Sequence, residues 1–277
     1  MLTVGDIAKW MDEWYPPNEA AEWDRVGLIV GSRSAPVKKV MLAVDPVAVT
    51  GREAIDMGAE MIITHHPLYL RGTSFVSEDD AKGRLVTDLI RNGVALFNAH
   101  TNADVMPGGV AQALAELVGL EETIPMEVTG ETESGALTGY GRIGDLKESV
   151  SLSEFASHVA SVLPAGPNGL LVGGDPDKRV RKVAVSGGSG DSFLDLANRL
   201  EADVFITADL RHHPASEHLE EDKAALICGS HFATEWPWLP HLASQLRNRA
   251  LQVGDTLEVV VSHAVTEPWT MHLATEG

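Results

Sequence analysis

The chain has 277 residues, of which 44% are hydrophobic, so it is long enough for one large core or two smaller ones. Acidic residues outnumber basic ones by 40 to 21, and the formal charge of -19 argues against general binding to nucleic acid or anionic lipid. The one cysteine, Cys228, excludes an intrachain disulfide, and we find neither a signal sequence nor an apolar run of about 18 residues. We therefore expect a soluble cytoplasmic protein.

The N-terminal part of the chain alternates between helical and strand patterns. Helical spacing begins after Thr3, a plausible N-cap, and ends before two prolines. Short apolar strands separated by single helices imply parallel βαβ units with right-handed crossovers. The predicted helices cover residues 3–14, 47–57, 81–91 and 108–118, and the predicted strands cover residues 40–44, the apolar run 61–63 and residues 94–101.

Two adjacent histidines, His65 and His66, follow the apolar run that starts at Met61. Pro67 cannot continue the hydrogen bonding of that strand, so the pair is predicted to stand at the carboxyl end of a buried strand. Open α/β sheets hold their ligands at this edge. The alternative reading is two histidines in a surface loop.

The sequence repeats itself in a way that predicts two similar α/β halves. GLIVG at 27–31 recurs as GLLVG at 169–173, and KKVMLAV at 38–44 aligns with RKVAVSG at 181–187. The third strand of each half ends in a histidine that is followed four residues later by a carboxylate. These two pairs are His100 with Asp104 and His231 with Glu235. Halves related by an approximate two-fold would turn these strand ends toward a shared cleft.

We place the boundary between the halves after residue 126, giving domains at 1–126 and 127–277, both with mainly parallel strands. The acidic stretch 121–133 contains proline and glycine and suits a linker. The glycine-rich stretch 135–146 suits a bulged or sharply turned edge strand. A helix over 152–163, capped by Ser151 or Ser153, opens the second half. A helix and a strand close the chain, and we leave open whether they pack on the first half.

Imidazoles and carboxylates together suit divalent Zn, Fe, Mn or Co. Adjacent histidines on a strand point in opposite directions, so two ions about 3.5 to 4 Å apart suit them better than one. The candidate ligands are His65, His66, Asp104, His231 and Glu235, with His100 either a ligand or a proton carrier. His212 and His213 either face the cleft or begin a helix. The remaining histidines are read as surface or packed side chains: His158, His218, His241, His263 and His272.

Several motifs together resemble the NIF-three-like family, whose members are known as GTP cyclohydrolase 1 type 2 homologues. The motifs are WDRVGLIVG, ITHHPL, AHTNAD, GYGRIG, VAVSGGSG and SHFATE, and the resemblance runs nearly end to end. It implies a duplicated α/β fold, a di-metal site between the halves and a toroidal homohexamer. It also implies that the family's metal ligands fall on His65, His66, Asp104, His231 and Glu235, and His100 matches a further family histidine.

The chain departs from the family pattern at two places, neither of which is a proposed ligand. Arg25 stands where asparagine usually follows the W-D pair, and T-A-D at 207–209 replaces T-G-E or T-G-D. The glycine-rich loop 187–190 has two readings: an anion site at a helix N-terminus, or a tight turn that needs glycine, which we favour. Arg211 either meets a phosphate or is solvated, and Cys228 is read as a small core residue.

The leading functional hypothesis is a metal-dependent hydrolase that acts on a nucleotide or phosphoester through water activated by two divalent ions. His65, His66, Asp104, His231 and Glu235 would hold the ions, and His100 would carry a proton. The alternative is a non-catalytic metal-binding interaction or assembly protein, because the ligands explain the histidines without turnover. A third, weaker hypothesis is metal storage or delivery.

Overall fold

The computed structural model describes residues 1–275, which form two compact α/β units. The first unit contains Met1–Met106 and Leu239–Thr266, and the second contains Pro107–Trp238 and the segment from Glu267 onward. The division after Met106 differs from the boundary expected after residue 126, because the intervening helix and strand pack on the sheet of the second unit. Within the described residues, no helix is both long enough and apolar enough to cross a bilayer.

The sheet of the first unit has five strands in the order β1-β4-β3-β2-β13, of which only β1 is antiparallel to its neighbour. The strands β2, β3 and β4 are almost wholly buried, which explains why they read as continuous apolar runs rather than as alternating ones. The strands are β1 (Gly27–Val30), β2 (Lys39–Ala43), β3 (Met61–Thr64), β4 (Ala95–Asn98) and β13 (Glu258–Val261).

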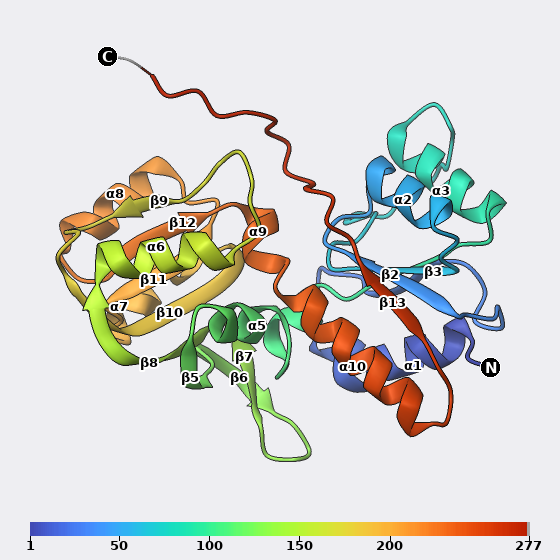
Figure 1. Cartoon of the computed structure of the whole chain (residues 1–277), viewed down its shortest axis with the longest axis horizontal. Helices are drawn as coiled ribbons and strands as arrows, with labels where there is room; N and C mark the ends of the chain where they lie inside the picture. Colours follow the sequence, from blue (N-terminus) through green and yellow to red (C-terminus); the bar gives the residue numbers. More distant parts are fainter. Residues whose placement is uncertain (276–277) are drawn as a thin grey trace. The chain divides into compact units, whose positions relative to one another are not determined.

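Helices cover both faces of this sheet, as Figure 1 shows: α2 and α3 on one face, and α1 and α10 on the other. The predicted cap of α1 is confirmed, since the Thr3 hydroxyl accepts a hydrogen bond from Asp6 N at 3.2 Å and the Asp6 carboxylate accepts one from Thr3 N at 2.8 Å. The helices are α1 (Val4–Trp14), η1 (Pro17–Glu19), α2 (Ala48–Asp56), α3 (Ala81–Arg91), α4 (Thr101–Val105) and α10 (Trp238–Gln252).

The sheet of the second unit is mixed, with the order β5-β8-β10-β11-β12-β9. Only β10, β11 and β12 are mutually parallel, so the expectation of mainly parallel strands does not hold for this unit. The run β9-β12-β11-β10 has the same order and the same strand directions as β1-β4-β3-β2. The strands are β5 (Leu120–Ile124), β8 (Arg142–Ser151), β9 (Leu171–Gly173), β10 (Arg179–Ser189), β11 (Val204–Ala208) and β12 (Ala225–Gly229).

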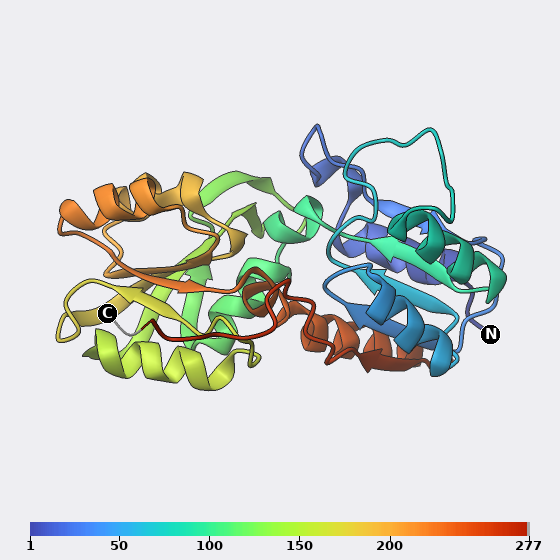
Figure 2. The same ribbon diagram turned by 90° about the horizontal axis from the view of Figure 1, so that it is seen from above.

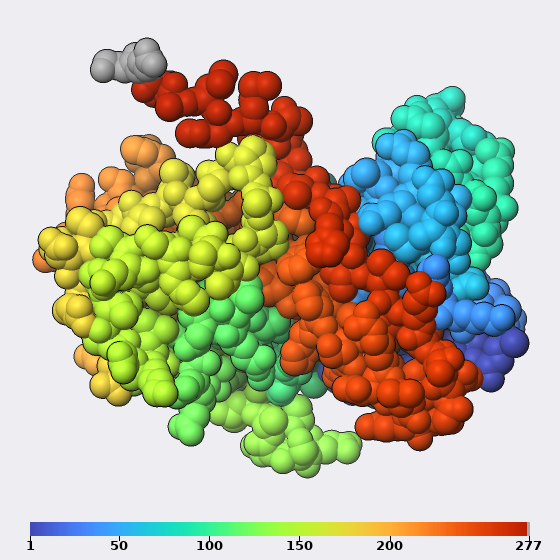
Figure 3. All heavy atoms as spheres, in the orientation of Figure 1, coloured from blue at the N-terminus to red at the C-terminus, as the bar shows by residue number. Residues whose placement is uncertain are grey.

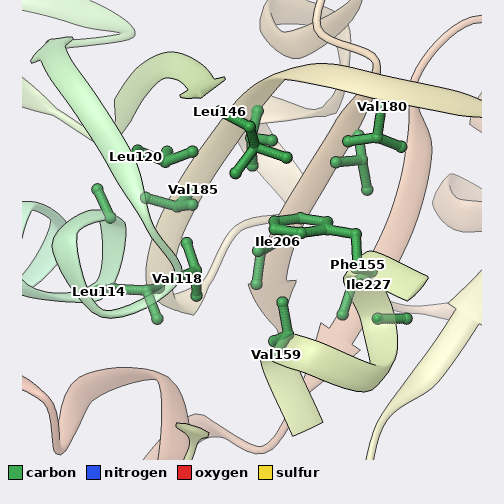
Figure 4. Close-up of a cluster of buried hydrophobic side chains, with 14 of the residues drawn as sticks. Leu114, Val118, Leu120, Leu146, Phe155, Val159, Val180, Val185, Ile206 and Ile227 are labelled. Carbon is green, nitrogen blue, oxygen red and sulfur yellow. The ribbon is translucent and has the colours of Figure 1, made fainter. Parts of the chain in front are cut away.

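Helices lie on both faces of the second sheet, with α6 on one face and α7 and α8 on the other (Figure 2). Ser151, one of the two expected caps, is the N-cap of α6. The side chains of α5 and α6 bury the larger core of the unit, in which Phe155 packs against strand residues such as Ile206 (Figure 4). The helices are α5 (Val110–Leu117), α6 (Leu152–Val162), η2 (Asp191–Phe193), α7 (Leu194–Arg199), α8 (His212–Glu220) and α9 (His231–Glu235).

The stretch 121–133 is not a linker. It contains most of β5 and all of β6 (Glu127–Glu131), which forms an antiparallel hairpin with β7 (Leu137–Tyr140). Every residue of β6 is exposed, and the hairpin protrudes as light green atoms at the lower edge of Figure 3. A hairpin that is held by backbone hydrogen bonds needs no apolar side-chain pattern. The acidic composition of this stretch therefore gave no sign of its strands.

Candidate metal centre

The two adjacent histidines stand just beyond β3, as the apolar run predicted. The amide of His65 donates to Ala43 O at 3.3 Å and the amide of His66 donates to Val44 O at 2.9 Å, so both backbones continue the pairing with the neighbouring strand. The His65 side chain is only 1% exposed, whereas His66 is half-buried. The pair therefore belongs to the sheet edge and not to a surface loop.

The rings of His65 and His66 do not point to opposite faces, contrary to our expectation. Their centroids are 5.0 Å apart and their planes are tilted by 44°. Ligand atoms of these two residues and of His100 all lie within 4.8 Å of one another. Beyond Thr64 the side chains depart from strict strand alternation although the amides continue the pairing, and both imidazoles lie beside the His100 ring, with centroids 5.2 and 5.6 Å from it.

Hydrogen bonds at Nδ1 fix the chemical form of the imidazoles. The Nδ1 of His65 lies 3.0 Å from Ala99 O, and a carbonyl oxygen only accepts hydrogen bonds, so this nitrogen carries the proton. The Nδ1 of His66 likewise lies 2.7 Å from Asp45 Oδ1. In the neutral form of both rings, a proton on Nδ1 leaves the lone pair on Nε2, which is the arrangement found in histidines that bind metals.

His100 shares this arrangement, with its Nδ1 2.9 Å from Asp24 Oδ2. The Thr101 hydroxyl also donates to this oxygen at 2.6 Å, and the Thr101 amide donates to it at 3.2 Å. Burial alone would raise the pKa of Asp24, but the hydrogen bonds from His100 and Thr101 outweigh burial and hold that pKa far below its usual value. Asp24 is thus an ionised, buried anchor for the His100 ring.

One turn of helix connects His100 to Asp104. The amide of Asp104 donates to His100 O at 3.1 Å, at the start of α4. This turn brings Asp104 Oδ1 to 3.6 Å from His65 Nε2. The first unit therefore gathers three imidazoles and a carboxylate at one strand edge.

The second unit carries a histidine and a carboxylate at the matching place. His231 and Glu235 stand on α9, one turn apart, and His231 Nε2 lies 2.9 Å from Glu235 Oε1. On the other side of the ring, His231 Nδ1 lies 2.6 Å from Asp209 Oδ2. Glu235 is only 4% exposed, so burial disfavours its charge unless a cation is close.

The glycine-rich segment lies within β10, where its pairing with β11 shifts register between Val185 and Ser189. Gly188 has a φ of +64°, and its amide donates to Thr234 Oγ1 at 3.0 Å. A Cβ at this position would overlap the Glu235 carboxylate and lie 3.1 Å from His231 Nε2. The positive φ and the close approach of the His231 and Glu235 side chains both require glycine here, but Gly188 lies in an irregular part of β10 and not in the expected turn.

The remaining candidates lie elsewhere. His212 and His213 begin α8, one of their two expected places. Arg211 pairs with Asp191. His218 is packed, with Nε2 2.9 Å from Ala224 O.

Sequence reasoning missed the three carboxylates that orient imidazoles: Asp24, Asp45 and Asp209. A usable signal was present for two of them. Asp209 directly follows β11, and Asp45 lies just beyond β2, so both are acids at the carboxyl ends of parallel strands. Although T-A-D was treated as a departure away from the ligands, its Asp209 contacts His231.

The model of the family described as Duf34/NIF3 (NGG1p interacting factor 3) matches residues 2–268. The chain belongs to this family. The resemblance in the sequence motifs is thereby confirmed.

Curated relatives and solved structures match almost the whole chain. A Streptomyces coelicolor protein named GTP cyclohydrolase 1 type 2 homolog is 44% identical, over 99% of this chain and 96% of its own length. A Clostridium perfringens protein of the same name is 33% identical, over 97% and 99%. A Bacillus cereus protein related to NIF3 matches with a TM-score of 0.89 and 24% identity, over 98% and 99%. A Staphylococcus aureus hypothetical protein has the same TM-score and coverage at 25% identity.

Proposed function

We propose that this NIF3 chain binds two divalent metal ions. The proposed ligands are His65, His66 and Asp104 in the first unit and His231 and Glu235 in the second. The single observation that carries the proposal is the common state of the imidazoles. Each has Nδ1 on an oxygen acceptor, the arrangement by which proteins preorganise histidine ligands, and the Nε2 atoms of His65 and His231 lie near the carboxylates of Asp104 and Glu235, which are also proposed ligands.

The donor set fits Zn, Fe, Mn or Co. Neutral imidazoles and carboxylates suit such ions. The one cysteine of the chain is not among the proposed ligands, because Cys228 lies in β12 and its thiol donates to Gly229 O at 3.8 Å. A buried glutamate at 4% exposure beside an imidazole is also well matched to a cation.

The reaction we propose is hydrolysis of a nucleotide or phosphoester. Divalent ions in such a site lower the pKa of bound water toward about 7 and stabilise negative charge that develops on the substrate. His100 would carry a proton through Nε2, because Asp24 holds the opposite nitrogen and can stabilise the ring when it is charged. The names of the curated relatives motivate a nucleotide as substrate.

His65→Ala tests this proposal, with His158→Ala on α6 as the matched control. We expect the first variant to contain fewer than two ions per chain and to lose hydrolysis of nucleotides and phosphoesters. The control should keep both properties. Full metal content together with full activity in His65→Ala would refute the proposal.

A non-catalytic interaction or assembly role is the second candidate. The family description itself refers to an interacting factor, and three large apolar side chains are exposed on the edge strands of the second unit, at Ile124, Val128 and Leu137. Assembly into a homohexamer would be part of such a role. Light scattering measures the assembly, and an inert protein that still holds two metals per chain would favour this role over hydrolysis.

We also infer that the two units arose by duplication. The support is the shared run of strands, β1-β4-β3-β2 and β9-β12-β11-β10, together with the recurring pair of histidine and carboxylate after β4 and β12. In this correspondence His100 matches His231, and Asp104 matches Glu235.

A further inference from the structure

A cavity of about 410 Å³ opens in the second unit beside Asp209, the partner of His231. Its volume is within the range of sites that bind small organic molecules. The end of β12 contributes to it, and so does the loop that precedes β9. The lining residues are Pro167, Asn168, Gly169, Leu171, Asp209, Leu210, Cys228, Gly229, Ser230, Trp269, Met271 and His272.

Large apolar side chains form much of the wall of this cavity and are open to solvent. Trp269 is 64% exposed, Met271 is 69% exposed and Leu171 is 71% exposed. An indole and a thioether grouped around one hollow provide a surface on which a planar ring can stack. The family match ends at residue 268, so Trp269 and Met271 lie beyond the part that the family model describes.

The segment that carries Trp269 is tied in place by Glu267. Its Oε1 accepts a hydrogen bond from the amide of Phe232 at 3.0 Å, and its Oε2 accepts one from Asn168 Nδ2 at 3.4 Å. One carboxylate thus joins the C-terminal segment to the helix that bears His231 and to the loop opposite. Figures 1 and 2 both draw this segment beside that loop.

The polar group of the cavity is a carboxylate. The Asp209 side chain is 52% exposed although its Oδ2 is 2.6 Å from His231 Nδ1. An ionised carboxylate only accepts hydrogen bonds, so a ligand that meets Asp209 must offer N–H or O–H donors. A ring with two adjacent donors matches the two oxygens of a carboxylate.

We propose that this cavity binds a planar heteroaromatic ring that stacks on Trp269 and directs adjacent N–H groups at Asp209. If the protein is the proposed hydrolase, this ring belongs to its substrate, which is then a compound with a nitrogenous aromatic base. That part of the inference rests on the proposed function. Ring binding itself requires neither metal nor turnover. A ring that contacts Asp209 is separated from the Nε2 atom of His231 by the Asp209 carboxylate and the His231 imidazole ring.

Cys228 supplies the readout, because it lines the cavity and is the one cysteine of the chain. The probe is guanosine, whose base has adjacent ring and amino N–H donors, and adenosine is the comparison because an acceptor nitrogen adjoins its amino group. Alkylation of Cys228 by N-ethylmaleimide is followed by intact mass, in protein treated with a chelator and in metal-loaded protein. We expect guanosine to slow alkylation in both states, and more strongly than adenosine.

Trp269→Ala tests the stacking wall, and Leu273→Ala is the matched control, since Leu273 is exposed in the same segment but does not line the cavity. Loss of base stacking predicts that guanosine binds Trp269→Ala about 5- to 150-fold more weakly, while the control binds it normally. Titration calorimetry measures the affinity of the same variants for guanosine directly, so it replaces the alkylation assay if Cys228 does not react.

Two results would overturn the inference: guanosine that neither protects Cys228 nor produces binding heat at millimolar concentration, or equal binding by Trp269→Ala and the original chain. Guanosine binding to a protein that hydrolyses nothing would instead support the cavity and refute only the hydrolase.

Discussion

Gly188→Ala tests the proposed metal ligands His231 and Glu235 separately from the stability of the fold. The residue has a φ of +64°, and an added Cβ would overlap the Glu235 carboxylate and lie 3.1 Å from His231 Nε2. A left-handed alanine costs about 1–2 kcal/mol wherever it occurs. At this position the side chains of the two proposed ligands must also move, whereas a metal site tolerates shifts of only about 0.2 Å.

The matched control is Gly58→Ala, since Gly58 has a φ of +69° and no atom within 4 Å of the added Cβ. Both variants should lose about 1–2 kcal/mol of unfolding free energy without metal. Only Gly188→Ala should lose metal affinity as well, by at least about 10- to 100-fold, the usual effect of disturbing the support of a ligand.

The assay is metal content by mass spectrometry after dialysis against graded chelator, together with urea unfolding of the metal-free proteins. We expect the metal content of Gly188→Ala to fall at chelator concentrations that leave Gly58→Ala fully loaded. Equal metal retention by the two variants, at equal unfolding free energy, would refute the view that His231 and Glu235 are ligands pressed against this glycine.

Three further predictions address the remaining groups. His100→Ala should keep its metal content but lose turnover, because we assign this residue proton transfer; loss of an ion in atomic analysis would make it a ligand. Asp24→Asn should destabilise the chelator-treated protein by about 1.5–3 kcal/mol at pH 7 in urea titrations, since Asp24 accepts charge-assisted hydrogen bonds. Because the pKa of Asp24 is lowered in the folded state, this contribution is complete above the unfolded value of 3.8 and is lost as the pH falls further; a difference that grew toward low pH would contradict the account. Burial raises the pKa of Cys228, so its alkylation at pH 8 should be slower than that of free cysteine and should match it in urea.

The sequence predicted the parts of the fold that depend on local chemistry. A buried apolar run that ends in His-His-Pro specifies a strand end, and Thr3 specifies the start of a helix. The linker expected at 121–133 is wrong, and the strand pairing there is not predictable from composition, because β6 exposes every side chain. Backbone pairing leaves no side-chain pattern to read.

The candidate site was predictable in its residue types but not in its orientation. Histidines and acids at strand ends are visible in the sequence, whereas Nδ1 contacts depend on residues far away along the chain. Asp24 and His100 are an example, with 2.9 Å between Oδ2 and Nδ1 across 76 positions. Side-chain direction at the end of a strand is set by such contacts, which is why His65 and His66 converge despite their adjacency.

The proposed duplication relates the contacts of the two units to each other. Thr64 corresponds to Thr207 in the repeat, so the position of His66 in the first unit corresponds to that of Asp209 in the second. One strand end thus offers an imidazole where the other offers the carboxylate that orients His231. In the first unit that orienting role belongs to Asp24 for His100, from a loop outside the repeated strands. The two corresponding strand ends therefore have different roles. The end of β3 supplies the imidazole of His66, and the end of β11 supplies Asp209, which orients the imidazole of His231.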